Sequence, residues 1–284
     1  MNCIFVSDLH GNQERYKILF KIISKELPDG VFLGGDLLPN DYSLTSSMED
    51  FIQDFIFKPI RILKKRNKIT PRFFIIFGND DPRIYEELFL RAEQNALLDY
   101  VHLKTISFLE YYVSGYSYIP PTPFHLKDWE RYDVSRHVDI GAIPPEQGRR
   151  TIDVPIDTIL SSTISDDLKN LSKNAPENKT IFLFHSPPYN SFLDRAALDG
   201  KMIDYAPLDS HIGSIAIQRF INKKQPYLTL HGHAHESSSI TGKWKQKFGN
   251  THSFSAAHDG PELALVRFDI SNLSTATREL VTID

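Results

Sequence analysis

Short apolar runs that end in glycine and polar residues constrain the fold of this chain more than any other feature. The first three runs are Ile4–Val6, Val31–Leu33 and Arg72–Phe77, and helix-like stretches separate them. Runs of this length, apolar on both faces and joined by helices, are typical of buried, largely parallel strands. The N-terminal part of the chain therefore predicts an α/β fold.

The rest of the chain continues this alternation less regularly. The predicted helices are Gln13–Lys25, Ser47–Lys64, Ile156–Leu171 and Gly213–Ile221, and the further strands are Tyr111–Tyr118, Thr180–Phe184 and Tyr227–Leu230. Towards the C-terminus apolar and polar residues alternate, which suits antiparallel strands. We expect residues 1–284 to form one domain with two mixed sheets between layers of helices, an α/β/β/α sandwich.

A Pro-rich, aromatic and charged stretch without clear periodicity, residues 119–155, interrupts this pattern. We call it the irregular segment; a loop of this length is commonly either functional or flexible. One interpretation makes Tyr116, Tyr118, Phe124 and Trp129 a lid that stacks on a ring of the substrate. The alternative is a packed surface loop or an oligomer contact.

Five predicted strands are each followed at once by residues that bind metal ions. These residues are Asp8 and His10, Asp36, Asn79, His185, and His233 with His235. The carboxyl ends of strands in an open α/β sheet form the crevice where ligands bind. Asp, His and Asn suit ions such as Mn²⁺, Fe²⁺, Zn²⁺ and Mg²⁺, and one carboxylate can bridge two ions about 3.5–4 Å apart. We expect a binuclear metal centre with Asp36 as the bridge.

Each fragment alone has a plainer interpretation. Asp8 and Asp36 fit ordinary turns, Asn79 fits a helix cap, and His185 fits a hydrogen-bonded core histidine. The alternating histidines at 231, 233 and 235 are harder to explain in that way. Side chains alternate along a strand, so His231 is expected to point away from the other two. The combination of fragments, in this order, carries the metal hypothesis.

The series D-x-H, G-D, G-N-x-[D/E], H and G-H-x-H, spread over residues 8–235, resembles the signature of calcineurin-like metallophosphoesterases. The resemblance implies the four-layer metallo-dependent phosphatase fold and two divalent ions, Mn²⁺ foremost, with Fe, Zn, Ni or Mg as alternatives. By resemblance, one ion is bound by Asp8, His10, Asp36 and His235, and the second by Asp36, Asn79, His185 and His233.

Further fragments resemble a subgroup, the small prokaryotic phosphoesterases related to Icc-type cyclic-nucleotide phosphodiesterases. They are His185-Ser186-Pro187-Pro188-Tyr189, His211-Ile212-Gly213-Ser214 and His233-Ala234-His235-Glu236. This implies hydrolysis of a phosphodiester, a cyclic nucleotide or another small metabolite, by in-line attack of a hydroxide held between the metals. Asn79 then orients the phosphate. Gly213 and Ser214 begin a predicted helix whose amides face the substrate anion, unless Ser214 is only a cap.

Asp80 departs from the family pattern, which usually has histidine at this position as acid or transition-state stabiliser. An aspartate can serve as the acid if nearby like charges raise its pKa. His211 is a second candidate for the catalytic acid, and His125 and His137 of the irregular segment are others. The departure favours a phosphodiesterase. The alternatives are a phosphomonoesterase with the same metals and, in a different class, a non-catalytic metal-binding scaffold.

Composition bounds the remaining possibilities. The net charge of −4 argues against broad contact with a nucleic-acid backbone, and a single cysteine, Cys3, excludes an internal disulfide framework. We see no basic leader before the first apolar run, and no run of ~18 apolar residues. We expect a cytoplasmic enzyme with a small phosphate-ester substrate and no membrane contact. The natural substrate, the metal and the oligomeric state stay open.

Overall fold

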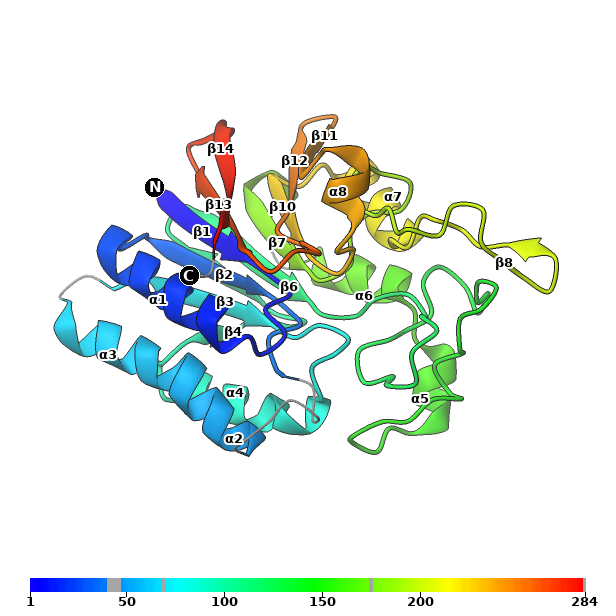
Figure 1. Ribbon diagram of the computed structural model, residues 1–284, viewed down its shortest axis with the longest axis horizontal. Coiled ribbons are helices and arrows are strands. Elements are labelled where there is room, and N and C mark those ends of the chain that lie inside the picture. The colour runs from blue at the N-terminus through cyan, green and yellow to red at the C-terminus, as the bar shows by residue number, and fades with distance from the viewer. Residues whose placement is uncertain (40–46, 68–69, 174–175, 283–284) are drawn as a thin grey trace.

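Two six-stranded sheets pack face to face, with helices on both outer faces (Figure 1). The computed structural model describes residues 1–39, 47–67, 70–173 and 176–282. The first sheet consists of β14 (Asn272–Val281), β13 (Leu263–Asp269), β1 (Asn2–Val6), β2 (Gly30–Gly34), β3 (Arg72–Ile76) and β4 (Asp99–Tyr100), in this order. Strands β1 to β4 are parallel to one another, and β13 pairs antiparallel with both of its neighbours, β1 and β14.

The second sheet repeats this design. It consists of β11 (Lys245–Phe248), β12 (Thr251–Ser255), β10 (Leu228–His231), β7 (Thr180–Phe184), β6 (Tyr111–Tyr116) and β5 (Thr105–Phe108), in this order. Its four central strands are parallel, and β11 and β5 pair antiparallel at the edges. The carboxyl ends of the parallel strands in both sheets therefore supply most of the loops where functional residues are expected.

Helices cover the outer face of each sheet. Over the first sheet lie α1 (Gln13–Glu26), α2 (Met48–Phe51), the π-helical turns η2 (Ile52–Phe57), α3 (Lys58–Arg66) and α4 (Glu86–Gln94). Over the second lie α6 (Ile164–Leu171) and α7 (Ile215–Lys224). The connections hold η3 (Arg83–Tyr85), α5 (Ile156–Ser161), η4 (Glu177–Lys179) and α8 (Ser237–Thr241), and a hairpin, β8 (Met202–Ile203) and β9 (Ala206–Pro207), projects from the body. The predicted four-layer α/β/β/α sandwich is confirmed.

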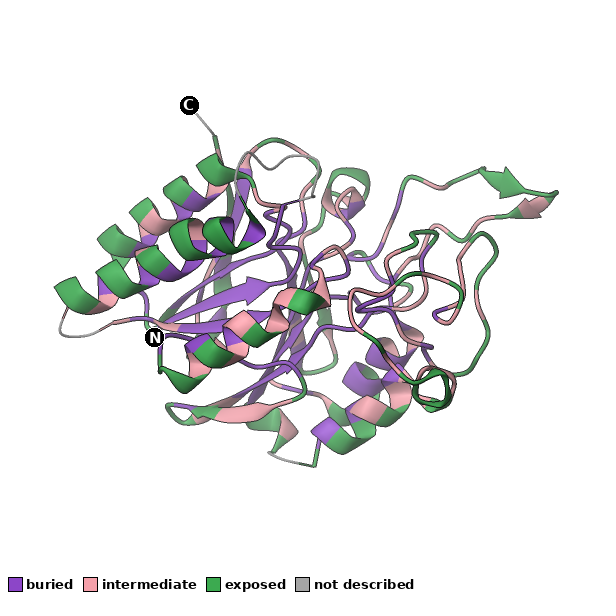
Figure 2. Cartoon of the chain, turned by 90° about the horizontal axis from the view of Figure 1, so that it is seen from below, coloured by how far each residue is buried: buried purple, intermediate pink, exposed green. Residues whose placement is uncertain are grey.

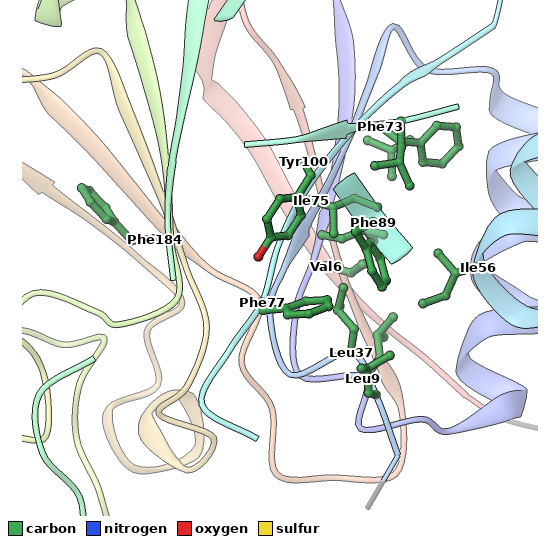
Figure 3. Close-up of a cluster of buried hydrophobic side chains, with 14 of the residues drawn as sticks. Val6, Leu9, Leu37, Ile56, Phe73, Ile75, Phe77, Phe89, Tyr100 and Phe184 are labelled. Carbon is green, nitrogen blue, oxygen red and sulfur yellow. The ribbon is translucent and has the colours of Figure 1, made fainter. Parts of the chain in front are cut away.

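The alternation of side chains along each buried strand builds two apolar cores. In β1, Ile4 and Val6 face the helices, whereas Cys3 and Phe5 face the second sheet. Figure 3 shows the helix side, where Phe89 of α4 packs edge-on against Phe77, with ring centroids 4.7 Å apart. The outer faces of the helices are exposed, as Figure 2 shows. Each large apolar side chain buried in these two cores stabilises the fold by about 1.5–3 kcal/mol. The two cores therefore hold the strand ends in place.

Two predicted helices differ in detail. Instead of one helix over residues 156–171, α5 and α6 are separate, because Ser162 and Thr163 have extended backbones and the Thr163 hydroxyl caps α6. The helix predicted from Ser47 contains π-helical turns in its middle and ends at Arg66. In the described part of the chain, no helix combines the length and apolarity needed to cross a membrane.

The irregular segment, all of which is described, contains no helix or strand and only isolated bridges. Trp129 is buried, as are Tyr116 and Tyr118 just before the segment, and the Trp129 indole N–H donates to the Asp81 carbonyl at 2.8 Å. Only Phe124 of the predicted lid is exposed. The lid interpretation is therefore wrong for the other three, because core packing and this hydrogen bond hold them inside.

Candidate metal centre

The loops that follow β1, β2, β3, β7 and β10 meet at one place between the two sheets. The Asp8 amide donates to the Gly35 carbonyl at 3.0 Å, and the His233 amide donates to Asp8 Oδ1 at 3.0 Å. His185 reaches across from the second sheet, with Nδ1 2.8 Å from the Gly34 carbonyl oxygen. The topology therefore gathers the residues that the sequence singled out at separate strand ends.

The first group of donors is Asp8, His10, Asp36 and His235. One ligand atom from each lies within 4.8 Å of all the others. The Nε2 atoms of His10 and His235 are 3.2 Å apart, and His235 Nε2 is 3.2 Å from Asp8 Oδ1. Because these lone pairs converge on one small volume, the donor set fits a divalent cation of the Mn, Fe or Zn type.

The second group shares Asp36 with the first. His185 Nε2 lies 3.3 Å from Asp36 Oδ2 and 3.1 Å from Asn79 Oδ1. The ring of His233 lies beside that of His185, with centroids 5.4 Å apart. The bond from His185 Nδ1 to the Gly34 carbonyl is the kind of contact that orients a metal-binding imidazole. Asn79, His185 and His233 thus lie beside the first group, although among the described Asp, Glu, His and Cys side chains only the first group brings its ligand atoms within 4.8 Å of one another.

The charges of the site favour added positive charge. Although burial opposes ionisation, the charge of His185 lowers the pKa of Asp36 to about 2. Burial likewise opposes the charged form of His185, yet the carboxylate of Asp36 raises the pKa of His185 to about 10. His235 follows the same pattern beside Asp8, with its pKa raised to about 9. Divalent cations would supply the positive charge that these carboxylates attract.

Four of these residues have left-handed backbones, which side chains other than glycine rarely adopt. The φ angles are +55° at Asp8, +43° at His10, +51° at Asp36 and +70° at His233. Each such conformation costs on the order of 1–3 kcal/mol and tends to concentrate at functional sites. The strain supports a functional role for this cluster rather than a purely structural one.

Asp81 was not among the predicted site residues, although it lies in the G-N-x-[D/E] fragment. Its buried carboxylate accepts hydrogen bonds from the amides of Leu37, Leu38 and Gly78 at 2.7–2.8 Å. It therefore ties the loop that carries Asp36 to the loop that carries Asn79. Gly78 must lack a side chain here, because a Cβ atom would lie 2.3 Å from Asp36 Oδ1.

Asp80 lies at the open side of the cluster. Its amide donates to Asp36 Oδ1 at 2.8 Å, and its Oδ1 accepts from Asn79 Nδ2 at 2.8 Å. Its Oδ2 is 3.6 Å from His10 Nδ1, and the side chain is 38% exposed. The negative charge of Asp36, and then burial, raise the pKa of Asp80 to about 6. A partly exposed carboxyl group therefore lies directly beside Asp36 and His10 of the first donor group.

The predicted anion site at Gly213 and Ser214 is corrected by the structure. The Ser214 hydroxyl and the amides of Ile215 and Ala216 donate to the carboxylate of Asp133, and the Gly213 amide donates to Asp194. Both Gly213 and Ser214 are buried. Since protein carboxylates already use these donors, Gly213 and Ser214 are not retained as substrate-binding residues.

The remaining histidines fall into different environments. His231 is buried and bonds the Ser186 carbonyl and the Thr229 hydroxyl, and burial lowers its pKa to about 4. These contacts fit the expectation that its side chain points away from those of His233 and His235. His125 and His137 are exposed, whereas His211 is partly buried and bonds a buried carboxylate, Asp194, at 2.8 Å. Of the alternative acids, His211 is therefore the one held in a defined position.

Comparisons with known proteins agree with this geometry. A family model described as calcineurin-like phosphoesterase matches residues 1–237. A search of the curated proteins finds no match.

Solved structures resemble the fold at low sequence identity. The protein TT1561 of Thermus thermophilus is 17% identical, with a TM-score of 0.58 and 99% of each chain covered. A dimetal phosphatase from Danio rerio is 10% identical, with a TM-score of 0.54, over 94% of this chain and 91% of that one. GAP50, the anchor in the inner membrane complex of Plasmodium, is 9% identical, with a TM-score of 0.51, over 100% and 89%.

These structures show a common fold, and the family match extends over the loops that carry the two donor groups. The resemblance seen in the sequence is thus confirmed, and this protein belongs to the calcineurin-like phosphoesterase family.

Proposed function

We propose that this protein is a two-metal phosphodiesterase that acts on a small phosphate diester. The observation that carries the proposal is the converging group Asp8, His10, Asp36 and His235, whose Asp36 also lies 3.3 Å from His185 of the second sheet. Asp8, His10 and His235 would complete the first group, and Asn79, His185 and His233 the second. Two such ions stabilise the charge of a phosphoryl transition state and activate water for in-line attack.

The chain's own groups have separate tasks in this proposal. Asp81 keeps the Asp36 and Asn79 loops at a constant spacing, so the donors are positioned before substrate arrives. The Asn79 amide group orients the phosphate, and its Nδ2 already donates towards the open side of the cluster, to Asp80. Asp80 and His211 are the candidates for delivering a proton to the leaving group.

Asp80 also supports a diester over a monoester substrate. A phosphate monoester carries close to two negative charges at neutral pH, whereas a diester carries one. A carboxyl group at the entrance, next to Asp36, repels the more highly charged ester more strongly. Cyclic nucleotides and other small diesters are therefore the substrates to examine first.

Three wider expectations belong to the same proposal. Mn²⁺ is the first metal to test, because the mixed Asp, His and Asn donors suit it. We treat residues 1–284 as one domain with the irregular segment as an insertion. The single, buried Cys3 fits a reducing compartment such as the cytoplasm.

The decisive experiment uses metal-stripped protein with added Mn²⁺ and paired chromogenic substrates, bis(p-nitrophenyl) phosphate and p-nitrophenyl phosphate. We expect metal-dependent cleavage that favours the diester and is lost in Asp36→Asn. Asp29→Asn is the matched control, because Asp29 is exposed at the amino end of the strands. Full activity of Asp36→Asn would contradict the two-metal site, and a monoester preference would contradict the interpretation of Asp80.

Asp80→His tests the specificity argument directly. The change removes the carboxyl group and restores the residue that the family usually has here. We expect the ratio of monoesterase to diesterase activity to rise about tenfold, which corresponds to roughly 1.4 kcal/mol of relieved repulsion. An unchanged ratio would mean that Asp80 does not select the substrate.

A non-catalytic scaffold is the alternative in a different class. Metal analysis separates the two, since a scaffold does not need stoichiometric metal and the enzyme should hold two ions per chain. The converging first group, with Asn79 and His185 in contact beside it, favours the enzyme.

A further inference from the structure

A buried carboxylate outside the two donor groups holds an imidazole in one orientation. Asp194 is completely buried, and its Oδ1 is 2.8 Å from His211 Nδ1. The same carboxylate accepts the amides of Asn190 and Ser191, both at 2.9 Å, and that of Gly213 at 3.3 Å. Because all these amides donate, Asp194 acts as an acceptor, and the proton between it and the ring belongs to His211 Nδ1.

The ring of His211 is also held from its other side. It packs edge-on against Tyr189, with centroids 5.7 Å apart. Asp209 accepts both the Tyr189 hydroxyl, at 2.7 Å, and the His211 amide, at 2.8 Å. The side chain of His211 is 21% exposed, and within the described residues nothing bonds its Nε2. The Nδ1 atom of His211 is therefore bonded to Asp194, and its Nε2 atom is free to contact a bound substrate.

The pair stands between the two loops of the second sheet that carry metal donors. The Ser214 amide donates to the Pro187 carbonyl at 2.9 Å, which joins the His211 segment to the loop that follows His185. The Arg195 amide, next to Asp194, donates to the Ser237 hydroxyl at 3.2 Å, two residues beyond His235. His211 and Arg195 also form an isolated bridge.

We propose that Asp194 is a positioning residue that holds the imidazolium form of His211 by its Nδ1–H, so that the proton on Nε2 is given to the leaving group. This rests on the proposed function. The oxygen of the attacking water forms a bond to phosphorus, and the water proton passes to solvent. The bond from phosphorus to the leaving oxygen breaks with its electron pair on oxygen, which takes the Nε2 proton. The neutral ring, still bonded to Asp194, regains a proton from solvent.

A leaving-group series tests the role of the pair. Methyl p-nitrophenyl phosphate needs no protonation of its leaving group, whereas methyl phenyl phosphate benefits from it. General-acid catalysis is worth on the order of 10²-fold or more. We expect Asp194→Asn and His211→Gln each to lower kcat for the phenyl ester about 10²-fold, to change the nitrophenyl ester little, and to leave KM nearly unchanged.

The double variant and a matched control complete the kinetic test. If both residues act through one proton, the double variant loses no more than either single variant. Ser191→Ala is the control, because it removes another donor to Asp194 Oδ1, at 3.2 Å, and leaves the His211 contact in place. We expect its two activities to stay within about threefold of the wild type. Equal losses on both esters, or multiplicative losses in the double variant, overturn the inference.

Nitrogen NMR of the wild-type protein gives a readout that needs neither activity nor a stable Asp194 variant. The His211 signals, assigned by their absence in His211→Gln, should show a protonated, hydrogen-bonded Nδ1. A ring protonated only at Nε2 overturns the inference even in an active enzyme. If the wild type shows no metal-dependent cleavage of the nitrophenyl ester, the proposed function itself fails and the inference fails with it.

Discussion

His102 is a buried histidine under the irregular segment, distant in sequence from every proposed metal ligand. Its Nδ1 accepts the Ser117 amide at 3.0 Å, and its ring packs edge-on against Trp129, with centroids 4.9 Å apart. Burial first, and then the positive charges of Arg83 and Arg131, lower its pKa well below 6.5. The folded protein therefore binds fewer protons at this group than the unfolded chain does.

This histidine predicts a pH dependence of stability. The contribution of His102 to the free energy of unfolding is complete above pH 6.5, which is the pKa of histidine in the unfolded chain. This contribution declines as the pH falls below 6.5, by about 1.4 kcal/mol per pH unit. We expect urea unfolding between pH 6.5 and 5 to show a shallower slope for His102→Asn than for the wild type. Ser117→Ala, which removes no titrating group, should keep the wild-type slope; identical slopes for all three proteins would contradict the prediction.

Asp81 carries a second prediction at the scale of single residues. Asp81→Asn places an amide nitrogen where one of the carboxylate oxygens accepted backbone hydrogen bonds, so buried amides of Leu37, Leu38 or Gly78 lose their partner. We expect a loss of about 2–3 kcal/mol in the free energy of unfolding, measured in urea without metal. The neighbouring Asp80→Asn changes a partly exposed side chain and should cost less than about 1 kcal/mol.

At the scale of elements, the start of α7 depends on a residue far away in the chain. Asp133 of the irregular segment accepts the amides of Ile215 and Ala216 and the Ser214 hydroxyl. A carboxylate at a helix N-terminus satisfies unpaired amides and complements the helix dipole. These hydrogen bonds therefore connect the irregular segment to α7, which covers the second sheet.

Removing this carboxylate should loosen both elements. We expect Asp133→Ala to lower the free energy of unfolding by about 1–3 kcal/mol and to speed amide hydrogen exchange in the first turn of α7. Asp139→Ala is the control, because Asp139 lies in the same segment with a side chain that is 71% exposed. Equal stabilities of the two variants would show that the cap contributes nothing.

At the scale of the whole molecule, metal binding should stabilise the fold, because the donors come from both sheets. An ion at one hundred times its Kd adds about 2.7 kcal/mol, which raises the Tm of a chain of this size by on the order of 5 °C. We expect Mn²⁺ to raise the Tm of the wild type and of Asp29→Asn by this amount. Asp36→Asn should shift much less, and an equal shift in all three proteins would place the bound ions elsewhere.

The parts of this protein that the sequence determined are those encoded over short distances. Apolar runs such as Ile4–Val6 predict buried strands because alternating side chains meet core on both faces. The residue that follows a strand lies at its carboxyl end wherever the strand is placed in the sheet. Asp8, Asp36 and His185 could therefore be named from the sequence alone, although the distances between them could not.

Only the tertiary structure decided the contacts between segments that are distant along the chain. Asp194 meets His211, Asp81 meets Leu37, and Asp133 meets Ser214, across 17, 44 and 81 residues. Although Asp81 lies in the G-N-x-[D/E] fragment, no local pattern names the partners of these carboxylates, because the partners are backbone amides or side chains that only the folding of the chain brings near. For the same reason the sequence left Trp129 open as part of a lid, a packed surface loop or an oligomer contact, and its burial depends on which elements pack over it.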